Sequence, residues 1–122
     1  MGVIEEMERP LRWYGVRMVF RALQREENVF EERVTIWKAA SFAEAIEQAE
    51  VEAADYADPE VGIWEYTGLA QAFETYIPDR APEPGDEVFS LLRTSELDTE
   101  EYLDRFFDTG GERQQRWGSE AD

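Results

Sequence analysis

The side chains available for chemistry in this chain are carboxylates, tyrosines and hydroxyls, because histidine and cysteine are both absent. The commonest general base and metal ligand and the thiolate nucleophile are therefore missing. Carboxylate pairs can do acid–base work when burial separates their pKa values, but among 29 acidic residues some pairs are expected by chance. The best pair, Glu31 and Glu32, lies on a predicted strand, where neighbouring side chains point to opposite faces and cannot share a substrate. We therefore predict that the chain is not an enzyme and has no catalytic residue.

Metal binding is also not indicated. Carboxylates are the ligands that Mg²⁺ and Ca²⁺ prefer, but no loop has them at a spacing such as D-x-D-x-D-G. Thiolate zinc sites are excluded together with cysteine. We predict neither a metal site nor a cofactor.

Arginine and tryptophan gather on two predicted strands near the start of the chain. An arginine stacked on a tryptophan can recognise a carboxylate, a phosphate or an acidic segment of a partner. The alternative is that these residues form ordinary cross-strand pairs, or that the C-terminal helix covers them. The candidate binding residues on the outer face of this hairpin are Trp13, Arg17, Arg21, Arg33 and Trp37.

The acidic residues form a second candidate surface. Residues 39–79 contain ten acids and no base, within a chain whose net charge is −17. Such a stretch can dock a basic protein, as carboxylates do in an inhibitor that imitates nucleic-acid phosphates. The alternative is a solvated helix face, although a helix without lysine forgoes stabilising pairs four residues apart. The candidate residues on the helix exterior are Glu44, Glu47 and Asp55, with Glu50 and Glu52 beside them.

The overall charge limits the partners. An acidic protein is repelled by phosphate backbones and by anionic membrane surfaces, so we expect neither nucleic acid nor membrane as a partner. The first ten residues lack a basic start followed by an apolar run, and no apolar stretch approaches the ~20 residues that span a bilayer. We therefore expect a cytoplasmic protein. Eleven of the twelve basic residues are arginine, which favours a bacterial source with a GC-rich genome.

The elements that must position these residues begin with a β-hairpin. Residues 12–23 and 29–39 alternate apolar and polar side chains on either side of a polar turn. We expect a register in which Val16 faces Ile36 and Met18 faces Val34 in the core. The same register sets Arg21 opposite Glu31, and Trp37 opposite Gly15, on the outer face.

The remaining elements follow from capping and turn signals. The sequence from Ser41 to Glu44 is a capping box that opens a helix, and Asp58-Pro59 ends it. Residues 63–77 have strand composition with a bulge or short loop expected at Gly68. Residues 87–93 predict a fourth strand, and Asp98 opens a second helix through Phe107. The order β-β-α-β-β-α predicts an α+β fold with a four-stranded antiparallel or mixed sheet and the main helix on one face.

At 122 residues the chain has the length of one domain. We expect a single α+β domain over residues 1–122, with its core in residues 11–108. The polar residues at 1–10 and 112–122 are expected to be flexible ends.

Four short motifs in a fixed order resemble a known family. The motif residues are Trp13, Tyr14 and Val16; Glu31, Glu32 and Val34; Ser41, Glu44, Ala45, Ala49 and Glu50; and Glu87, Val88, Phe89 and Ser90. Over residues 12–93 this pattern resembles the bacterial family called domain of unknown function 4288, although residues 68–75 depart from it. Because that family has no assigned activity, the resemblance implies a fold and no mechanism.

These observations favour a non-catalytic module that binds a basic protein partner, such as a bacterial inhibitor or immunity-type protein. The competing hypothesis is a domain that binds a small ligand or acts as an enzyme. It would use either the cleft between sheet and helix or the arginine–tryptophan face of the hairpin. A homodimer through an exposed strand edge is compatible with both hypotheses.

Overall fold

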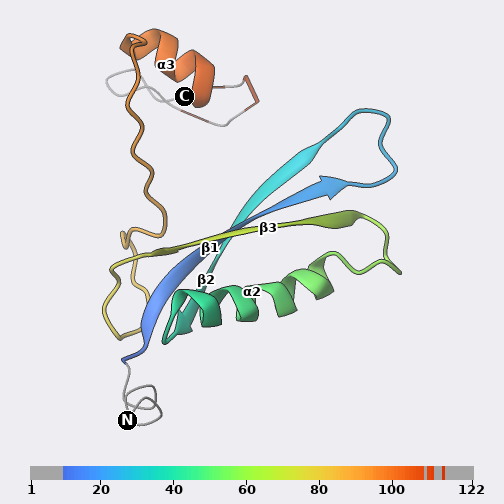
Figure 1. Ribbon diagram of the computed structural model, residues 1–122. Helices are drawn as coiled ribbons and strands as arrows, with labels where there is room; N and C mark the ends of the chain where they lie inside the picture. Colours follow the sequence, from blue (N-terminus) through green and yellow to red (C-terminus); the bar gives the residue numbers. More distant parts are fainter. Residues whose placement is uncertain (1–9, 109, 112–113, 115–122) are drawn as a thin grey trace. The chain divides into compact units, whose positions relative to one another are not determined.

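The computed structural model describes residues 10–108, 110, 111 and 114. The chain divides into two compact units, the sheet unit of residues 1–90 and the C-terminal unit of residues 91–122. The described part of the sheet unit, residues 10–90, contains three strands and one helix (Figure 1). The ends predicted to be flexible lie almost wholly outside the described residues.

The sheet has three antiparallel strands, so the predicted four-stranded sheet is wrong. The strands are β1 (Arg12–Ala22), β2 (Phe30–Ala39) and β3 (Trp64–Glu74), in the spatial order β2-β1-β3. Residues 87–93, predicted as a fourth strand, form none. Phe89, the aromatic residue of this segment, packs its ring against that of Phe73, with 5.1 Å between the ring centroids. The segment is therefore held through a side chain that packs on another side chain, and not by pairing of its backbone.

The hairpin of β1 and β2 forms as expected, but its register differs by one residue. Val16 lies opposite Thr35 and Met18 opposite Arg33, where Ile36 and Val34 were predicted. Because side chains alternate along a strand, a slip of one residue moves every β2 side chain to the other face of the sheet.

Helix α2 (Phe42–Tyr56) covers one face of the sheet, which we call the inner face; the opposite face is the outer face (Figure 1). The helix begins at Ser41, whose Oγ accepts a hydrogen bond from the Glu44 amide at 3.1 Å, so the predicted capping box is confirmed at this bond. Small side chains let the helix lie close to the strand. The buried core consists mainly of Tyr14, Val16, Met18 and Phe20 from β1 and Ala45, Ala49 and Ala53 from α2.

Strand β3 contains the irregularity predicted at Gly68. The pairing with β1 shifts between Met18, opposite Ala70, and Phe20, opposite Tyr66. Gly68 has a φ of 92°, which a residue without a Cβ adopts without strain. The Thr67 hydroxyl donates to the carbonyl of Val19 at 2.8 Å, so the bulge is tied to the central strand.

The C-terminal unit contains helix α3 (Thr99–Phe106). It begins at Asp98, as predicted, where the carboxylate accepts a hydrogen bond from the Glu101 amide at 2.9 Å. The Arg93 guanidinium lies 4.3 Å from the centre of the Phe106 ring and donates to the Tyr102 hydroxyl at 3.1 Å. Among the described residues, neither helix has the length and apolar character needed to cross a bilayer.

Candidate interaction surface

The five arginine and tryptophan residues predicted to share the outer face of the hairpin are divided between two faces. Trp13, Arg17 and Arg21 lie on the outer face, opposite to the side chains that pack under α2. Arg33 and Trp37 lie on the inner face, across from Met18 and Tyr14, because of the slipped register. The predicted arginine–tryptophan face therefore does not exist as one surface.

Arg33 instead joins β2 to the helix. Its guanidinium donates two hydrogen bonds to the Glu52 carboxylate, at 2.6 and 2.9 Å, and lies 3.8 Å from the centre of the Tyr56 ring. The Tyr56 hydroxyl donates to Glu31 at 2.6 Å, and this hydrogen bond raises the pKa of Tyr56. The paired carboxylate of Glu52 likewise raises the pKa of Arg33. These satisfied polar ends explain why long side chains occupy the inner face of β2, since each has a partner on α2 or β2.

Two of the five acidic residues on α2 are used within the fold. Glu52 binds Arg33, and Glu50 accepts a hydrogen bond from the Tyr66 hydroxyl at 2.9 Å. Burial, followed by the bond to Glu50, raises the pKa of Tyr66 to about 12. Glu47 and Asp55 are exposed, and Glu44 is half-buried beside the N-cap. The acidic surface of the helix is consequently smaller than the sequence predicts.

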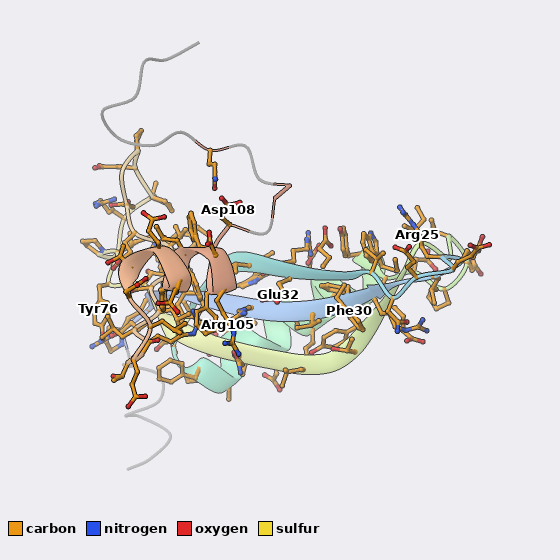
Figure 2. The ribbon with its side chains drawn as sticks, turned by 90° about the horizontal axis from the view of Figure 1, so that it is seen from above. Arg25, Phe30, Glu32, Tyr76, Arg105 and Asp108 are labelled. Atoms are coloured by element: carbon orange, nitrogen blue, oxygen red, sulfur yellow. The ribbon has the colours of Figure 1, made fainter. Side chains whose placement is uncertain are left out.

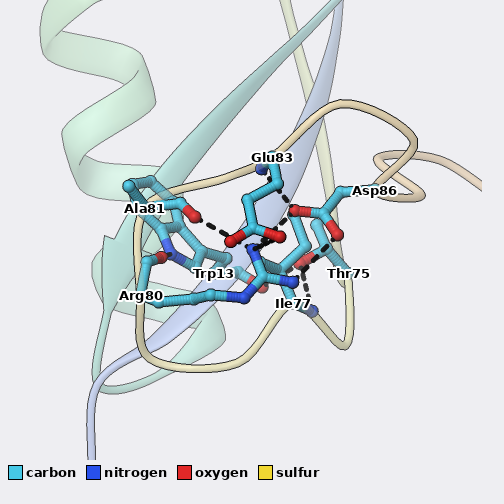
Figure 3. Close-up of polar contacts among 7 residues, drawn as sticks. All are labelled: Trp13, Thr75, Ile77, Arg80, Ala81, Glu83 and Asp86. Carbon is cyan, nitrogen blue, oxygen red and sulfur yellow. Dashed lines mark hydrogen bonds and ion pairs between the residues drawn. The ribbon is translucent and has the colours of Figure 1, made fainter.

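One end of the outer face is closed by residues 75–86 (Figure 3). The indole Nε1 of Trp13 donates to the Arg80 carbonyl at 2.6 Å, and the Thr75 hydroxyl donates to the Trp13 carbonyl at 2.9 Å. The Arg80 guanidinium in turn binds both oxygens of the Asp86 carboxylate, at 2.8 and 3.1 Å. This ion pair, with the amide of Glu83 as a further donor, lowers the pKa of Asp86 to about 2. Trp13 is therefore engaged by contacts within the fold, with residues 75–86 packed at this end of the outer face.

The next part of the outer face is covered by two aromatic rings. An added Cβ on Gly15 would come within 2.3 Å of the Phe73 ring, so this ring lies directly on the glycine backbone. The Phe89 ring packs edge-on against Phe73, and the Arg17 guanidinium lies 5.6 Å from its centre. Arg17 thus marks the boundary at which the covering segment ends.

Beyond Arg17 the outer face carries exposed apolar side chains. Phe30 is 56% exposed, Val34 38% and Leu69 54%. A hollow of ≈ 170 Å³ lies on this face, and its lining comes from all three strands: Arg17, Val19, Glu32, Leu69 and Gln71. Figure 2 shows Phe30 and Glu32 along β2. We call this surface the outer-face patch; its residues are Arg17, Val19, Phe30, Glu32, Val34, Leu69 and Gln71.

The charged side chains in and beside the outer-face patch form pairs of opposite charge. The Nε of Arg17 donates to Glu32 at 3.0 Å, and Arg21 forms an ion pair with Glu65 at 3.1 Å. Within residues 10–90 no helix lies over this part of the outer face. In a chain with a net charge of −17, the patch is therefore a locally neutral and partly apolar surface.

A separate cavity lies where the end of α2 meets the start of β3. It has a volume of ≈ 340 Å³, and its lining is mostly apolar: Leu23, Ala53, Ala54, Ala57, Pro59, Trp64, Glu65 and Tyr66. This is the kind of sheet–helix cleft that the competing ligand hypothesis requires. The described residues include no cluster of three or more acidic side chains placed to hold a metal ion.

Comparison with known proteins gives no relative for this chain: no family model, curated protein or solved structure matches it. The resemblance to domain of unknown function 4288 stays a hypothesis.

Proposed function

We propose that the chain is a non-catalytic protein–protein interaction module that contacts its partner through the outer-face patch. The observation that carries the proposal is the exposure of Phe30, Val34 and Leu69 around the Arg17–Glu32 pair. A contiguous, partly apolar surface bordered by polar groups is typical of protein interfaces, whereas singly scattered apolar residues are ordinary. The hollow beside Leu69 offers a place for one anchoring side chain of the partner.

The charge of the chain supports a basic partner. A net charge of −17 accelerates the encounter with a positively charged protein, while the neutral patch can be desolvated at little electrostatic cost. In this proposal the acidic residues of α2, including Glu47 and Asp55, steer the partner from a distance. An inhibitor or immunity-type protein of the bacterial cytoplasm is the form of module that this combination favours.

Affinity capture with matched variants tests the proposal. Leu69→Ser removes an exposed apolar side chain from the patch, and Val51→Ser removes one that is 71% exposed on α2. With a partner purified from the native host, we expect Leu69→Ser to weaken binding about tenfold or more, as at an interface hot spot, and Val51→Ser to leave it unchanged. Raising the salt concentration should weaken the complex, because it screens the steering charges. Equal binding by both variants would reject the patch.

The cavity beside Trp64 supports a second candidate function, the binding of a small apolar ligand. Its lining is concave and mostly apolar, as ligand sites usually are. Ala54→Phe would fill the cavity from the exposed side of α2. We expect an apolar fluorescent probe such as anilinonaphthalene sulfonate to bind the wild type and not this variant. If neither protein binds the probe, the ligand hypothesis loses its support.

A further inference from the structure

Among the residues that the structure describes, strand β2 has one edge without a neighbouring strand, because the strand order places β1 on its other side. The Ala22 amide donates to the Val29 carbonyl at 2.8 Å, at the end of the hairpin where the two strands begin to pair. In an antiparallel ladder, alternate residues turn their backbone groups toward the partner strand. The odd-numbered residues of β2 therefore direct their backbone N–H and C=O groups to β1. The even-numbered residues from Glu32 to Lys38 direct theirs to the free edge.

The two edges of the sheet differ in regularity. Strand β3 is interrupted by the bulge at Gly68, and a bulge disrupts pairing with a further strand. Strand β2 pairs with β1 without a shift from Phe30 to Ala39. Its edge is therefore a continuous row of backbone donors and acceptors, which is suited to pairing with another strand.

The sequence of β2 is complementary to itself when two copies run antiparallel. A two-fold axis perpendicular to the sheet at Thr35 keeps both α2 helices on the same side. It also brings even-numbered residues opposite even-numbered residues, so the free backbone groups of both copies meet. The facing pairs would be Glu32 with Lys38, Val34 with Ile36, and Arg33 with Trp37.

This register pairs the side chains of the two copies more favourably than the registers shifted by two residues in either direction. It sets opposite charges, two β-branched side chains and a guanidinium–indole pair across from one another, and each kind of pair stabilises a sheet. A shift of two residues in one direction sets Phe30 opposite Lys38 and Glu32 opposite Ile36. A shift in the other direction sets Val34 opposite Lys38. Charged side chains on an edge strand usually prevent pairing, but here they match a second copy of the same strand.

We propose that two copies of this chain associate through their β2 edges, with Thr35 at the two-fold axis, to form a continuous six-stranded sheet. On its outer face, the ion pair of Arg17 with Glu32 in one copy would continue into the ion pair of Lys38 with Asp79 in the other. The edge shares Glu32 and Val34 with the outer-face patch, but the pairing joins backbone groups of two copies of β2 and requires no protein partner.

The charge-swap variants test the register directly. Glu32→Lys and Lys38→Glu each create two like-charge contacts per dimer, and each should raise the dimer dissociation constant roughly tenfold. The double variant restores opposite charges across the edge and should dimerise within about threefold of the wild type. It also lacks both ion pairs within the chain, so recovery can come only from the contact between copies. Glu47→Lys changes the net charge as Glu32→Lys does and should dimerise at least as well as the wild type.

Sedimentation velocity of the chain alone, over a range of protein and salt concentrations, is the measurement. Added salt should strengthen the dimer, because it screens the repulsion between two acidic copies, whereas it should weaken a complex with a basic partner. A chain that stays monomeric at its solubility limit in high salt overturns the proposal. A dimer that the single swaps do not weaken, or that the double variant does not restore, overturns it as well.

Val34→Pro provides a second test. The Val34 amide points to the free edge, so proline removes a bond to the second copy and none to β1. We expect a monomer whose circular dichroism matches that of the wild type; a folded variant that still dimerises would contradict pairing at this edge. Because these experiments use the chain alone, their failure would leave the partner proposal unaffected. Leu69→Ser, in contrast, should leave the dimer intact.

Discussion

At Gly15 a single added methyl group should lower the stability of the fold, because an aromatic ring occupies the space that the methyl group would need. Gly15 is buried in β1, and a Cβ there would lie 2.3 Å from two atoms of the Phe73 ring. Carbon atoms in contact are separated by about 3.5–4.0 Å, so the ring has to move by more than an ångström. That movement would disturb its packing against Phe89 and, through it, the position of Arg17.

The expected cost of Gly15→Ala follows from these distances. Overpacking typically costs about 1–3 kcal/mol, and the lower chain entropy of alanine returns roughly 0.5–1 kcal/mol of it. The difference is a net loss of about 0–2.5 kcal/mol, and a loss near 1 kcal/mol, in the middle of that range, lowers the melting temperature of a unit of this size by roughly 4–8 °C. Thermal unfolding followed by circular dichroism measures this change.

Phe73→Ala provides the control for Gly15→Ala. Once the ring is removed, adding the methyl group should change stability by less than about 0.5 kcal/mol, so the two substitutions should be strongly non-additive. If Gly15→Ala unfolds at the wild-type temperature and the two substitutions are additive, the Phe73 ring does not lie on Gly15 and does not cover this part of the outer face.

Three further predictions concern the cap, the helix and the loop. Ser41→Ala should destabilise the sheet unit by about 1 kcal/mol, measured by urea unfolding, because the Glu44 amide loses its acceptor. Glu52→Gln should lower the melting temperature by weakening the pair with Arg33, whereas the exposed Glu47→Gln should leave it unchanged or raise it. Because the folded pKa of Asp86 is lowered from 3.8 to about 2, its stabilisation is present above pH 3.8 and lost as the pH falls through about 2. Asp86→Asn should therefore be less stable than the wild type at neutral pH and converge with it in acid melts; a constant difference would contradict the ion pair.

Local signals in the sequence predicted the elements that depend on local chemistry. The helix caps at Ser41 and Asp98 and the bulge at Gly68 each follow from one or two residues whose backbone preferences are strong. The hairpin itself was equally predictable from two alternating segments around a polar turn.

The register of the hairpin could not be predicted in the same way. Both faces of β2 carry apolar groups, with Val34 and Ile36 on one face and Trp37 on the other, so the pattern does not select a side. The choice depends on α2, which supplies Glu52 and Tyr56 as partners for Arg33. The spacing of those two residues, four apart on one helix face, was the only signal in the sequence.

The candidate surface was predicted in part. Trp13, Arg17 and Arg21 do lie on the outer face, but the loop that closes over Trp13 depends on Arg80 and Asp86, far away in the sequence. A contact over such a separation leaves no pattern in a single sequence. For the same reason, the exposure of Phe30 and Leu69 became visible only once β3 was placed beside β1.

The closure of residues 75–86 over Trp13 also gives the chain a built-in reporter of local opening. Between residues 39 and 92, Arg80 is the only basic residue and hence the only place where trypsin can cut. Its carbonyl, at the bond that trypsin would cleave, is the acceptor for the Trp13 indole. Cleavage therefore requires this closure to release, and the rate of the cut reports how often the loop opens while the rest of the sheet unit stays folded.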